Sequence, residues 1–219
     1  MFFDRDPKLQ DDAIPVPEGL GTDVVVSPDT RRANRIPPGQ SRTKKWPVLD
    51  ASGTPAFDPE TWKLRVDGMV NAPLSLDLAQ ALALPRVRVF ADFHCVTRWS
   101  RLGNLWEGVG TRELVRLAGG LRPEAKFVLA HGLDSGWTTN LPVDEFLADD
   151  ALIAFTHDGL PIPANHGGPA RLIVPRLYAW KSAKWLSRLE FLPQDKAGFW
   201  ERNGYHMHGD PWTEERYGW

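Results

Sequence analysis

The sequence predicts an α+β fold: a single domain that is rich in short β-strands, contains few helices and has long loops. Three observations predict this class. Several runs alternate apolar and polar residues, as strands with one buried face do. The helical patterns are short, and 19 glycines with 19 prolines among 219 residues indicate many turns. Ten tryptophans and a hydrophobic share of 42% are sufficient for the core of one domain.

The expected strands lie in the middle of the chain. Residues 62–68 alternate and end at a glycine turn. Residues 86–95 alternate again, which places a row of small and apolar side chains on one face of the strand. That row is Val87, Val89, Ala91, Phe93 and Cys95. Further strands are expected at residues 126–130, 152–156, 170–174 and 186–192.

Three short helices are expected between these strands. The first covers residues 75–84, opened by Ser75 and closed before a proline. The second covers residues 111–118, with Thr111 as its N-cap and two glycines as its stop. The third covers residues 142–149. With so few helices and no internal repeat, an α+β single domain is the expected architecture.

The ends of the chain differ from its middle. Residues 1–33 are expected to form an irregular acidic segment, followed by one domain over residues 34–205 and a tail over residues 206–219. Residues 1–30 carry seven acids against two bases, whereas residues 31–45 carry six bases and no acid. Residues 171–188 form a second basic stretch without acids. Such clusters suit a small anionic ligand, or simply a solvated face.

Composition also excludes several classes of function. The net charge of −2 and the lack of a nucleic-acid motif argue against a nucleic-acid partner. No apolar run approaches the roughly 18 residues of a membrane span. No apolar core follows the Arg31-Arg32 pair, so we expect a cytoplasmic protein rather than an exported one. Esterase, dinucleotide and P-loop signatures are absent, and His206-x-His208 has no third metal ligand at a suitable spacing.

Cys95 is the single cysteine, so an intramolecular disulfide and a multi-cysteine metal site are excluded. It stands where a strand gives way to a loop, and Arg98 and Arg101 follow within six residues. Nearby arginines are expected to lower the pKa of the thiol and favour thiolate, which is a nucleophile and a soft metal ligand. A lone cysteine is also often a small buried apolar residue. Both interpretations stay open on spacing alone.

A second group of candidate residues lies in two segments, residues 166–171 and 181–185. Two glycines in the first segment let backbone approach a ligand closely, and Arg171 offers a planar fork to an anion. In the second segment, Lys184 offers a point charge and Ser182 a hydroxyl. Taken together with Cys95, these residues suggest a large anionic cofactor. A glycine-proline turn followed by a basic edge strand is the alternative.

These segments resemble a known family. Residues 93–100 (FHCVTRWS), 166–171 (HGGPAR) and 181–186 (KSAKWL) are similar to the molybdopterin-binding domain of the sulfite oxidase superfamily. The resemblance is closest to the small, haem-free bacterial members and extends from about Asn34 to Tyr205. It implies a mixed α+β fold, an oxidoreductase and a molybdenum–molybdopterin cofactor.

The resemblance also implies roles for individual residues. Cys95 is similar to the cysteine that ligates molybdenum beside the two dithiolene sulfurs of the pterin, and Tyr205 to a tyrosine next to the metal. The remaining residues are similar to contacts of the pterin and its phosphate: Asn34, Arg35, His166, Arg171, Ser182, Ala183 and Lys184. One thiolate suffices because the cofactor supplies most of the other ligands.

The resemblance implies oxygen-atom or two-electron transfer on a small substrate, either a sulfite-like oxyanion or a sulfoxide. Ala33 and Ser100 stand where sulfite-oxidising members carry arginines, so Arg98 or Arg101 would have to replace them. We expect a monomer that exchanges electrons with a separate electron-transfer protein. Two alternatives are a pterin-binding protein without catalysis and a metal-free thiol enzyme that pairs Cys95 with His94 or His166.

Overall fold

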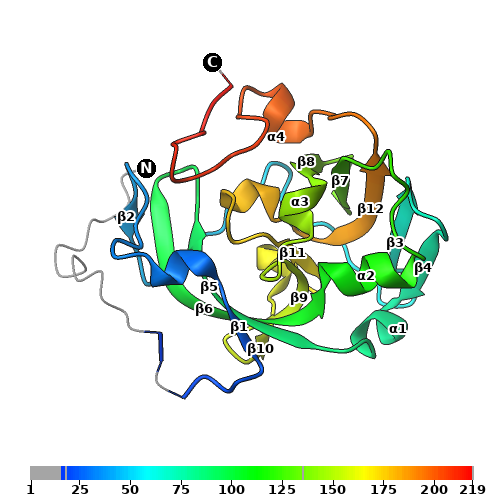
Figure 1. The fold of residues 1–219 in the computed structure, drawn as a ribbon, viewed down its shortest axis with the longest axis horizontal. Helices are drawn as coiled ribbons and strands as arrows, with labels where there is room; N and C mark the ends of the chain where they lie inside the picture. Colours follow the sequence, from blue (N-terminus) through cyan, green and yellow to red (C-terminus); the bar gives the residue numbers. More distant parts are fainter. Residues whose placement is uncertain (1–15, 18, 135, 219) are drawn as a thin grey trace.

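Two β-sheets contain most of the regular secondary structure in the computed structural model, which describes residues 16–17, 19–134 and 136–218 (Figure 1). The strands are β1 (Val24–Val26), β2 (Ser41–Arg42), β3 (Lys63–Gly68), β4 (Leu74–Asp77), β5 (Val87–His94), β6 (Trp99–Gly110), β7 (Phe127–Gly132), β8 (Thr138–Pro142), β9 (Leu152–His157), β10 (Leu160–Pro161), β11 (Arg171–Ile173) and β12 (Leu186–Leu192). The α-helices are α1 (Leu78–Leu82), α2 (Thr111–Leu117), α3 (Val143–Phe146) and α4 (Phe199–Arg202). The predicted α+β class is confirmed.

Both sheets mix parallel and antiparallel pairs within the described residues. The larger sheet has the order β1-β5-β6-β9-β10, with β2 paired to β6 and β11 paired to β9. The smaller sheet has the order β4-β3-β12-β7-β8. In the smaller sheet β12 pairs in parallel with β3 and antiparallel with β7, which joins distant parts of the chain. Figure 1 shows the segment after β12 crossing the top of the molecule toward the β5–β6 end.

The main core lies between the two sheets. Val66 and Phe191 come from the smaller sheet, Ile153 and Leu172 from the larger one, and Leu114 from α2. All five side chains are at most 1% exposed. Burial of apolar surface on this scale is the main driving force for holding the sheets together. The loops that connect the strands are not needed for this core and are available to form a site.

Strand β5 is buried on both faces. Val89, Ala91, Phe93 and Cys95 pack in a second apolar cluster, which confirms the expected shared face. On the opposite face, Asp92 is also buried and forms a two-point ion pair with Arg35. A buried, hydrogen-bonded ion pair is strongly destabilised when one partner is removed. The Arg35–Asp92 pair therefore ties the segment before β2 to the strand that leads to Cys95.

The expected helices form but are shorter, and the third, expected over residues 142–149, covers only Val143–Phe146. Residues 74–77 form strand β4, and α1 starts only after Asp77, whose side chain and Gln80 form a reciprocal capping box. Thr111 stands inside α2 rather than at its N-cap, and its hydroxyl donates to the carbonyl of Phe146. The Asp77–Gln80 pair has the spacing of a capping box, which the expected start at Ser75 overlooked, whereas the partner of Thr111 lies 35 residues away in the sequence.

Six of the described strands were not expected, among them β4 and the two-residue strands β2 and β10. Strand β6, twelve residues long, follows the Cys95 turn and pairs with β5 and β9. Strand β8 pairs with β7. Within the segment expected to be irregular, β1 pairs in parallel with β5, so regular structure starts before residue 34. Residues 1–15 and 18, which carry most of the acidic run, lie outside the described part of the chain.

The expected tail, residues 206–219, is packed against the domain as far as residue 218. Arg216 is 4% exposed and donates to the carbonyls of Val96 and Pro38. His208 lies between Glu145 of α3 and Glu215. The hydrogen bond with Glu145, followed by that with Glu215, raises the pKa of His208 to about 9. These contacts fasten the C-terminal segment across the loop that carries Cys95.

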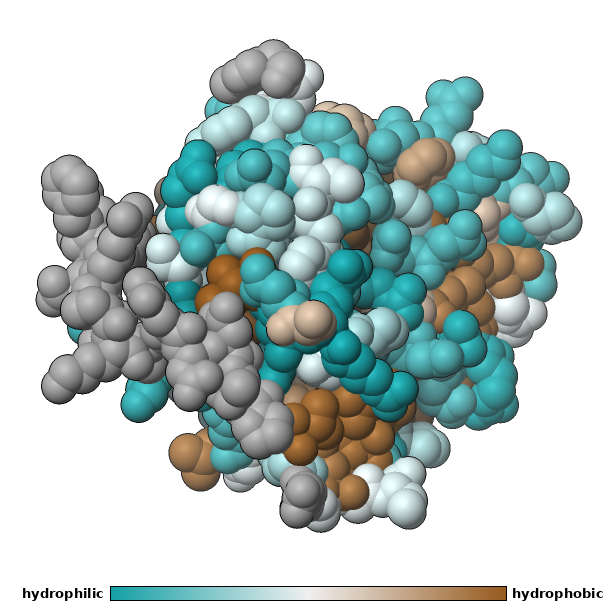
Figure 2. All heavy atoms as spheres, turned by 60° about the vertical axis from the view of Figure 1, so that its left-hand side comes forward, coloured by the Kyte–Doolittle hydropathy of each residue, from teal (hydrophilic) through white to brown (hydrophobic). Residues whose placement is uncertain are grey.

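The described surface leaves few large apolar side chains exposed. They are Val48, Leu49, Leu82, Leu160 and Tyr217. Figure 2 shows one face, on which hydrophilic surface surrounds separate apolar patches. Among the described residues, no helix has both the length and the apolar character that a bilayer span requires.

We expect the His208 contacts to make stability depend on pH. The folded-state pKa of His208, about 9, lies above its ordinary value of 6.5. Its stabilisation is therefore complete below pH 6.5 and is lost as the pH rises through 9. Because about a third of the side chain is exposed, the effect should be about 1 kcal/mol or less. Urea unfolding at several pH values, compared between the wild type and His208→Gln, measures it.

The difference between the two proteins isolates His208 from other groups that titrate in the same range. At pH 6 we expect the free energy of unfolding to be larger for the wild type than for the variant. Near pH 10, above the folded-state pKa of about 9, we expect the two free energies to converge. A constant difference across this range would contradict the prediction.

Candidate functional site

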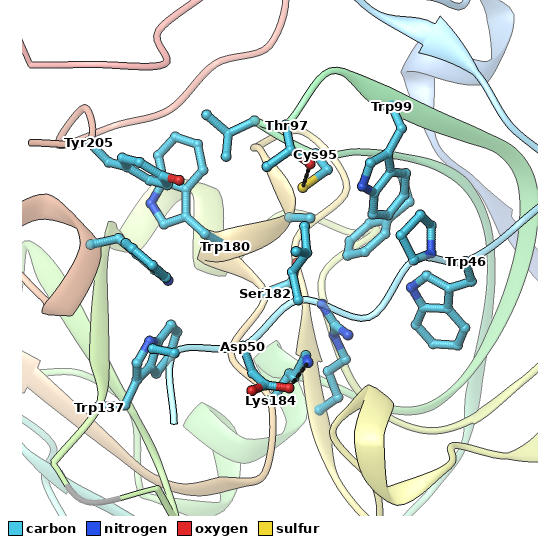
Figure 3. A pocket seen from close by; sticks show the side chains of 18 of the residues that line it. Trp46, Asp50, Cys95, Thr97, Trp99, Trp137, Trp180, Ser182, Lys184 and Tyr205 are labelled. Atoms are coloured by element: carbon cyan, nitrogen blue, oxygen red, sulfur yellow. Dashed lines mark hydrogen bonds and ion pairs between the residues drawn. The ribbon is translucent and has the colours of Figure 1, made fainter. Parts of the chain in front are cut away.

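Six tryptophans and the single cysteine line one cavity of about 890 Å³, its open mouth included (Figure 3). The tryptophans, out of ten in the chain, are Trp46, Trp99, Trp137, Trp180, Trp185 and Trp200. The walls come from the loop before β3, the β5–β6 turn, the loop between β7 and β8, the segment from β11 to β12, and α4 with the residues that follow it. Aromatic walls with a few polar side chains are typical of sites for cofactors and small molecules.

Cys95 reaches the cavity because β5 ends one residue before it. The Cys95 backbone N–H donates to the carbonyl of Trp99, and the Arg98 N–H donates to the carbonyl of Cys95. The tight turn needs Arg98 in the left-handed region, with a φ of 74°. Cys95 is 7% exposed, and Thr97 Oγ1 lies 3.2 Å from its sulfur. The turn thus fixes the thiol at the wall of the cavity.

The expected net lowering of the Cys95 pKa is wrong, and the arginines that act on the thiol are not the expected ones. Burial raises the pKa of the Cys95 thiol, and this outweighs the lowering by hydrogen bonds from Thr97 and by Arg171 and Arg216. Arg98 donates to the carbonyl of Gly39, and Arg101 pairs with Asp158. Neither lines the cavity, so they do not take the place of the arginines missing at Ala33 and Ser100.

Arg171 is the buried cation of the cavity. It is 4% exposed, and burial lowers the pKa of its guanidinium to about 9, with the Cys95 thiol acting in the opposite direction. In the described part of the chain, one guanidinium nitrogen donates to the carbonyl of His166, whereas Nε has no partner. A buried guanidinium without a carboxylate is costly. Its position therefore suits an anionic ligand in the cavity.

A second polar region of the cavity is formed by Lys184, Asp50 and Asp134. Lys184 Nζ lies 3.7 Å from a carboxylate oxygen of Asp50, and burial, then the charge of Arg171, lowers the pKa of Lys184 to about 8. Burial raises the pKa of Asp134. Asp134 Oδ2 accepts from the Ser52 hydroxyl, and the buried Oδ1 has no partner. A carboxylate oxygen in this state can accept from an amino group of a ligand.

Tyr205 and two tryptophans form the wall on the other side of Cys95. Tyr205 stacks on Trp200 with ring centroids 5.1 Å apart and meets Trp180 edge-on at 5.0 Å. Figure 3 shows the Tyr205 hydroxyl on the cavity side, facing the region of Thr97 and Cys95. Burial, followed by the charge of Cys95, raises the pKa of Tyr205. The phenol therefore stays protonated and can donate a hydrogen bond at neutral pH.

A buried ion pair supports this aromatic wall from behind. Lys181 and Glu201 have side chains that are 0% exposed, with Nζ 2.7 Å from Oε1. Glu201 Oε1 also accepts from the indole N–H of Trp180, and Lys181 Nζ donates to the Asn140 and Met207 carbonyls. The pair connects α4 with the segment before β12. It holds Trp180 and the residues around Tyr205 in one arrangement.

The structure brings five of the sequence-predicted residues to the cavity wall and leaves four elsewhere. Those at the wall are Cys95, Arg171, Ser182, Lys184 and Tyr205. Ala183 is buried in the main core, and Arg35 is paired with Asp92 on the far face of β5. Asn34 accepts from the N–H of Ile36. His166 stacks on Trp46 with ring centroids 3.8 Å apart, and it is Trp46, not His166, that lines the cavity.

Sequence reasoning missed Trp46, Trp137, Thr97, Asp50 and Asp134 as cavity residues. The high number of tryptophans was the one signal in the sequence for an aromatic cavity, but it did not identify which indoles line it. The acids lie in loops where aspartate is common in turns, so nothing in the sequence marks them.

Neither histidine proposed as a base is placed to activate the thiol. His94 is 0% exposed, alternates away from Cys95 along β5 and hydrogen-bonds to Ser100. Burial lowers the pKa of His94 to about 4 and that of His166 to about 4 as well. In the described chain, the hydrogen-bond partner of the sulfur is Thr97. The geometry therefore gives no support to a metal-free cysteine–histidine enzyme.

The donors of the cavity fit a molybdenum–molybdopterin cofactor. A thiol suits the metal, a buried guanidinium without an acid suits an anionic group, and an unpaired carboxylate oxygen suits the amino groups of a pterin. Gly167, with a φ of 103°, lets the backbone approach Lys184, because an added Cβ would lie 2.8 Å from the Cβ of that lysine. The two segments expected to bind a cofactor are thereby packed against each other.

Comparison with known proteins points to the same cofactor. Residues 51–200 match the family described as the oxidoreductase molybdopterin binding domain. The chain is 46% identical over 189 residues to a protein of Bacillus subtilis (strain 168) named "Uncharacterized oxidoreductase YuiH", a match that covers 86% of this chain and 94% of the relative. It is 29% identical over 181 residues to the sulfite oxidase of Gallus gallus, covering 69% of this chain and 39% of the relative.

Two further similarities extend the comparison. A protein-methionine-sulfoxide reductase catalytic subunit, MsrP of Campylobacter jejuni, is 28% identical over 163 residues, covering 66% of this chain and 54% of the relative. Among solved structures, the sulfane dehydrogenase SoxCD of Paracoccus pantotrophus superposes with a TM-score of 0.62 at 25% identity, covering 67% of this chain and 42% of the other.

Fold, cavity and comparisons agree with the resemblance seen in the sequence. The family match spans the strands, the Cys95 turn and the segments around Arg171 and Lys184. The chain therefore belongs to the molybdopterin-binding oxidoreductases of the sulfite oxidase superfamily, an enzyme family whose cofactor is molybdenum–molybdopterin.

Proposed function

We propose that Cys95 ligates molybdenum in this protein and that the cavity carries out two-electron transfer on a small substrate. One observation carries the proposal: the Cys95 sulfur and the acid-free Arg171 guanidinium lie at the same cavity wall. When bound, the molybdenum cofactor supplies the redox chemistry that the side chains themselves lack. The alternative of a pterin-binding protein without catalysis would have no need for Tyr205 beside the thiol.

Each polar residue at the wall has a distinct binding role in this proposal. Arg171 and Lys184 neutralise the anionic part of the cofactor, and Asp134 accepts from the amino groups of the pterin ring. Ser182 Oγ accepts from the backbone N–H of Val174, so its own proton is available to a phosphate oxygen. The aromatic side chains exclude water and present ring faces to the planar pterin.

We further propose that the substrate is uncharged, and that a sulfoxide is favoured over sulfite. Two cationic side chains, Arg171 and Lys184, line the described cavity, and the cofactor uses both in this proposal. The wall near Cys95 and Tyr205 is formed by Thr97, Trp180 and Trp200. Once the cofactor takes up both cations, this part of the wall offers hydroxyl groups and indole rings, which favours an apolar substrate with one hydrogen-bond acceptor. One relative carries the name of a methionine-sulfoxide reductase.

In this assignment Tyr205 orients the substrate, because its phenolic O–H donates a hydrogen bond to the sulfoxide oxygen. Reduction of a sulfoxide to a thioether consumes two electrons and two protons and releases water. A separate electron-transfer protein would supply the electrons one at a time. The chain's own contribution is binding, orientation and exclusion of water.

The ligand role of Cys95 is tested by replacing the sulfur. We expect Cys95→Ala to lose turnover about tenfold or more and to change the paramagnetic resonance of its molybdenum, while its far-ultraviolet circular dichroism is retained. The other contacts of the cofactor still hold the metal, so metal analysis of protein made in a molybdenum-replete host normalises the signal. Ser100→Ala is a matched control, since Ser100 lies buried in the same hairpin and contacts His94 rather than the cavity. An unchanged paramagnetic resonance signal of molybdenum in loaded Cys95→Ala would refute the ligand role.

The substrate preference has its own test. We expect the molybdenum-loaded protein, supplied with electrons by a reduced viologen dye, to reduce a small dialkyl sulfoxide. We expect its oxidation of sulfite with ferricyanide to have a kcat/KM at least tenfold lower. Equal or higher efficiency with sulfite would overturn the uncharged-substrate assignment, while the ligand role of Cys95 would stand.

The orienting role of Tyr205 predicts a defect in turnover. Loss of one hydrogen bond worth roughly 1.4–2.8 kcal/mol in the transition state lowers kcat/KM about 10- to 100-fold. Tyr205→Phe should show this loss with unchanged molybdenum content. Tyr217→Phe serves as the control, because Tyr217 contacts the Tyr205 ring edge-on and is 47% exposed. If both variants lose activity equally, packing rather than the hydroxyl is responsible.

A further inference from the structure

The turn that presents Cys95 also places a hydroxyl donor on its sulfur. Thr97 Oγ1 lies 3.2 Å from Sγ, and the backbone N–H of Thr97 donates to the same sulfur. Figure 3 shows the contact between the two side chains at the cavity wall. Two backbone hydrogen bonds close the turn around this pair, from Cys95 to Trp99 and from Arg98 to Cys95. The donor geometry is therefore built into the hairpin.

This arrangement differs from what a threonine in a turn usually does. Turn hydroxyls most often bond to nearby backbone groups and thereby stabilise the turn itself. Here the side-chain partner of the Thr97 hydroxyl is the thiol sulfur, two residues earlier. Thr97 also lines the cavity, in which the described cations are Arg171 and Lys184. The hydroxyl thus donates its hydrogen bond to the atom that is proposed to bind the metal.

We propose that Thr97 tunes the reduction potential of the metal through the Cys95 sulfur, an inference that rests on the proposed ligand role of Cys95. Hydrogen bonds to ligand sulfurs draw negative charge away from the metal and are among the determinants of its potential. The bond is stronger when the sulfur carries more negative charge, as it does when the metal is reduced. Thr97 therefore stabilises the reduced state and raises the potential. It is a positioning residue, since it acts through Cys95.

The experiment compares two variants of the molybdenum-loaded enzyme. Thr97→Val keeps the shape of the side chain and removes the hydroxyl, whereas Thr97→Ser keeps the hydroxyl and removes the methyl group. A potentiometric titration, followed by the paramagnetic resonance of molybdenum, reads the potential without relying on activity. At a fixed applied potential we expect the reduced-to-oxidised ratio to fall on the order of tenfold in Thr97→Val, about 59 mV for one electron. Thr97→Ser should stay near the wild type.

The matched pair separates the possible outcomes. An unchanged potential in loaded Thr97→Val overturns the proposal, and so does an equal shift in both variants, which would point to packing. If Thr97→Val lacks molybdenum while Thr97→Ser holds it, the hydroxyl serves loading rather than tuning, and the proposal also fails. Thr97→Ala replaces the valine variant if that protein does not fold. Failure of the ligand role itself appears separately, as an unchanged molybdenum signal in loaded Cys95→Ala.

Discussion

A buried guanidinium that lacks a carboxylate is the constraint around which this cavity is built. Arg171 follows the glycine-rich turn and begins β11, so the sheet holds its backbone while its side chain reaches the wall beside Cys95. Burial lowers its pKa to about 9, and Nε has no partner within the described chain. An anionic ligand removes this penalty. The site is therefore arranged for a charged cofactor before any substrate is considered.

The strong polar contacts outside the cavity hold its walls in place. Arg35 and Asp92 fix β5 from its far face, and Lys181 with Glu201 fixes the aromatic wall from behind. Both pairs are almost completely buried and hydrogen-bonded, which is the condition for a buried ion pair to be tolerated. As a result the walls stay apart, and a thiol, a phenol and six indoles line an open cavity. Preorganised walls of this kind reduce the cost of ordering a bound cofactor.

The sequence predicted the segments that line the cavity more accurately than it predicted the strands. The segments around Cys95, Arg171 and Lys184 were identified because their residue types are uncommon together, and the fold brings all three to one cavity. By contrast, β6 and β8 were not expected. Strand β6 contains three glycines, which weaken a strand pattern locally although its pairing with β5 and β9 stabilises it. Asn34 and Arg35 stay predictions as cofactor contacts, although Arg35 already has a buried partner.

By itself, the sequence determined the fold class, the family and the identity of the chemical groups, because these follow from local periodicity and from short motifs. Only the tertiary structure decided which of those groups share a cavity and what their environment does to them. Burial reverses the expected effect on the Cys95 pKa, since desolvation outweighs nearby positive charge. Desolvation depends on every segment packed around an atom, and that information is not present in the residues next to it along the chain.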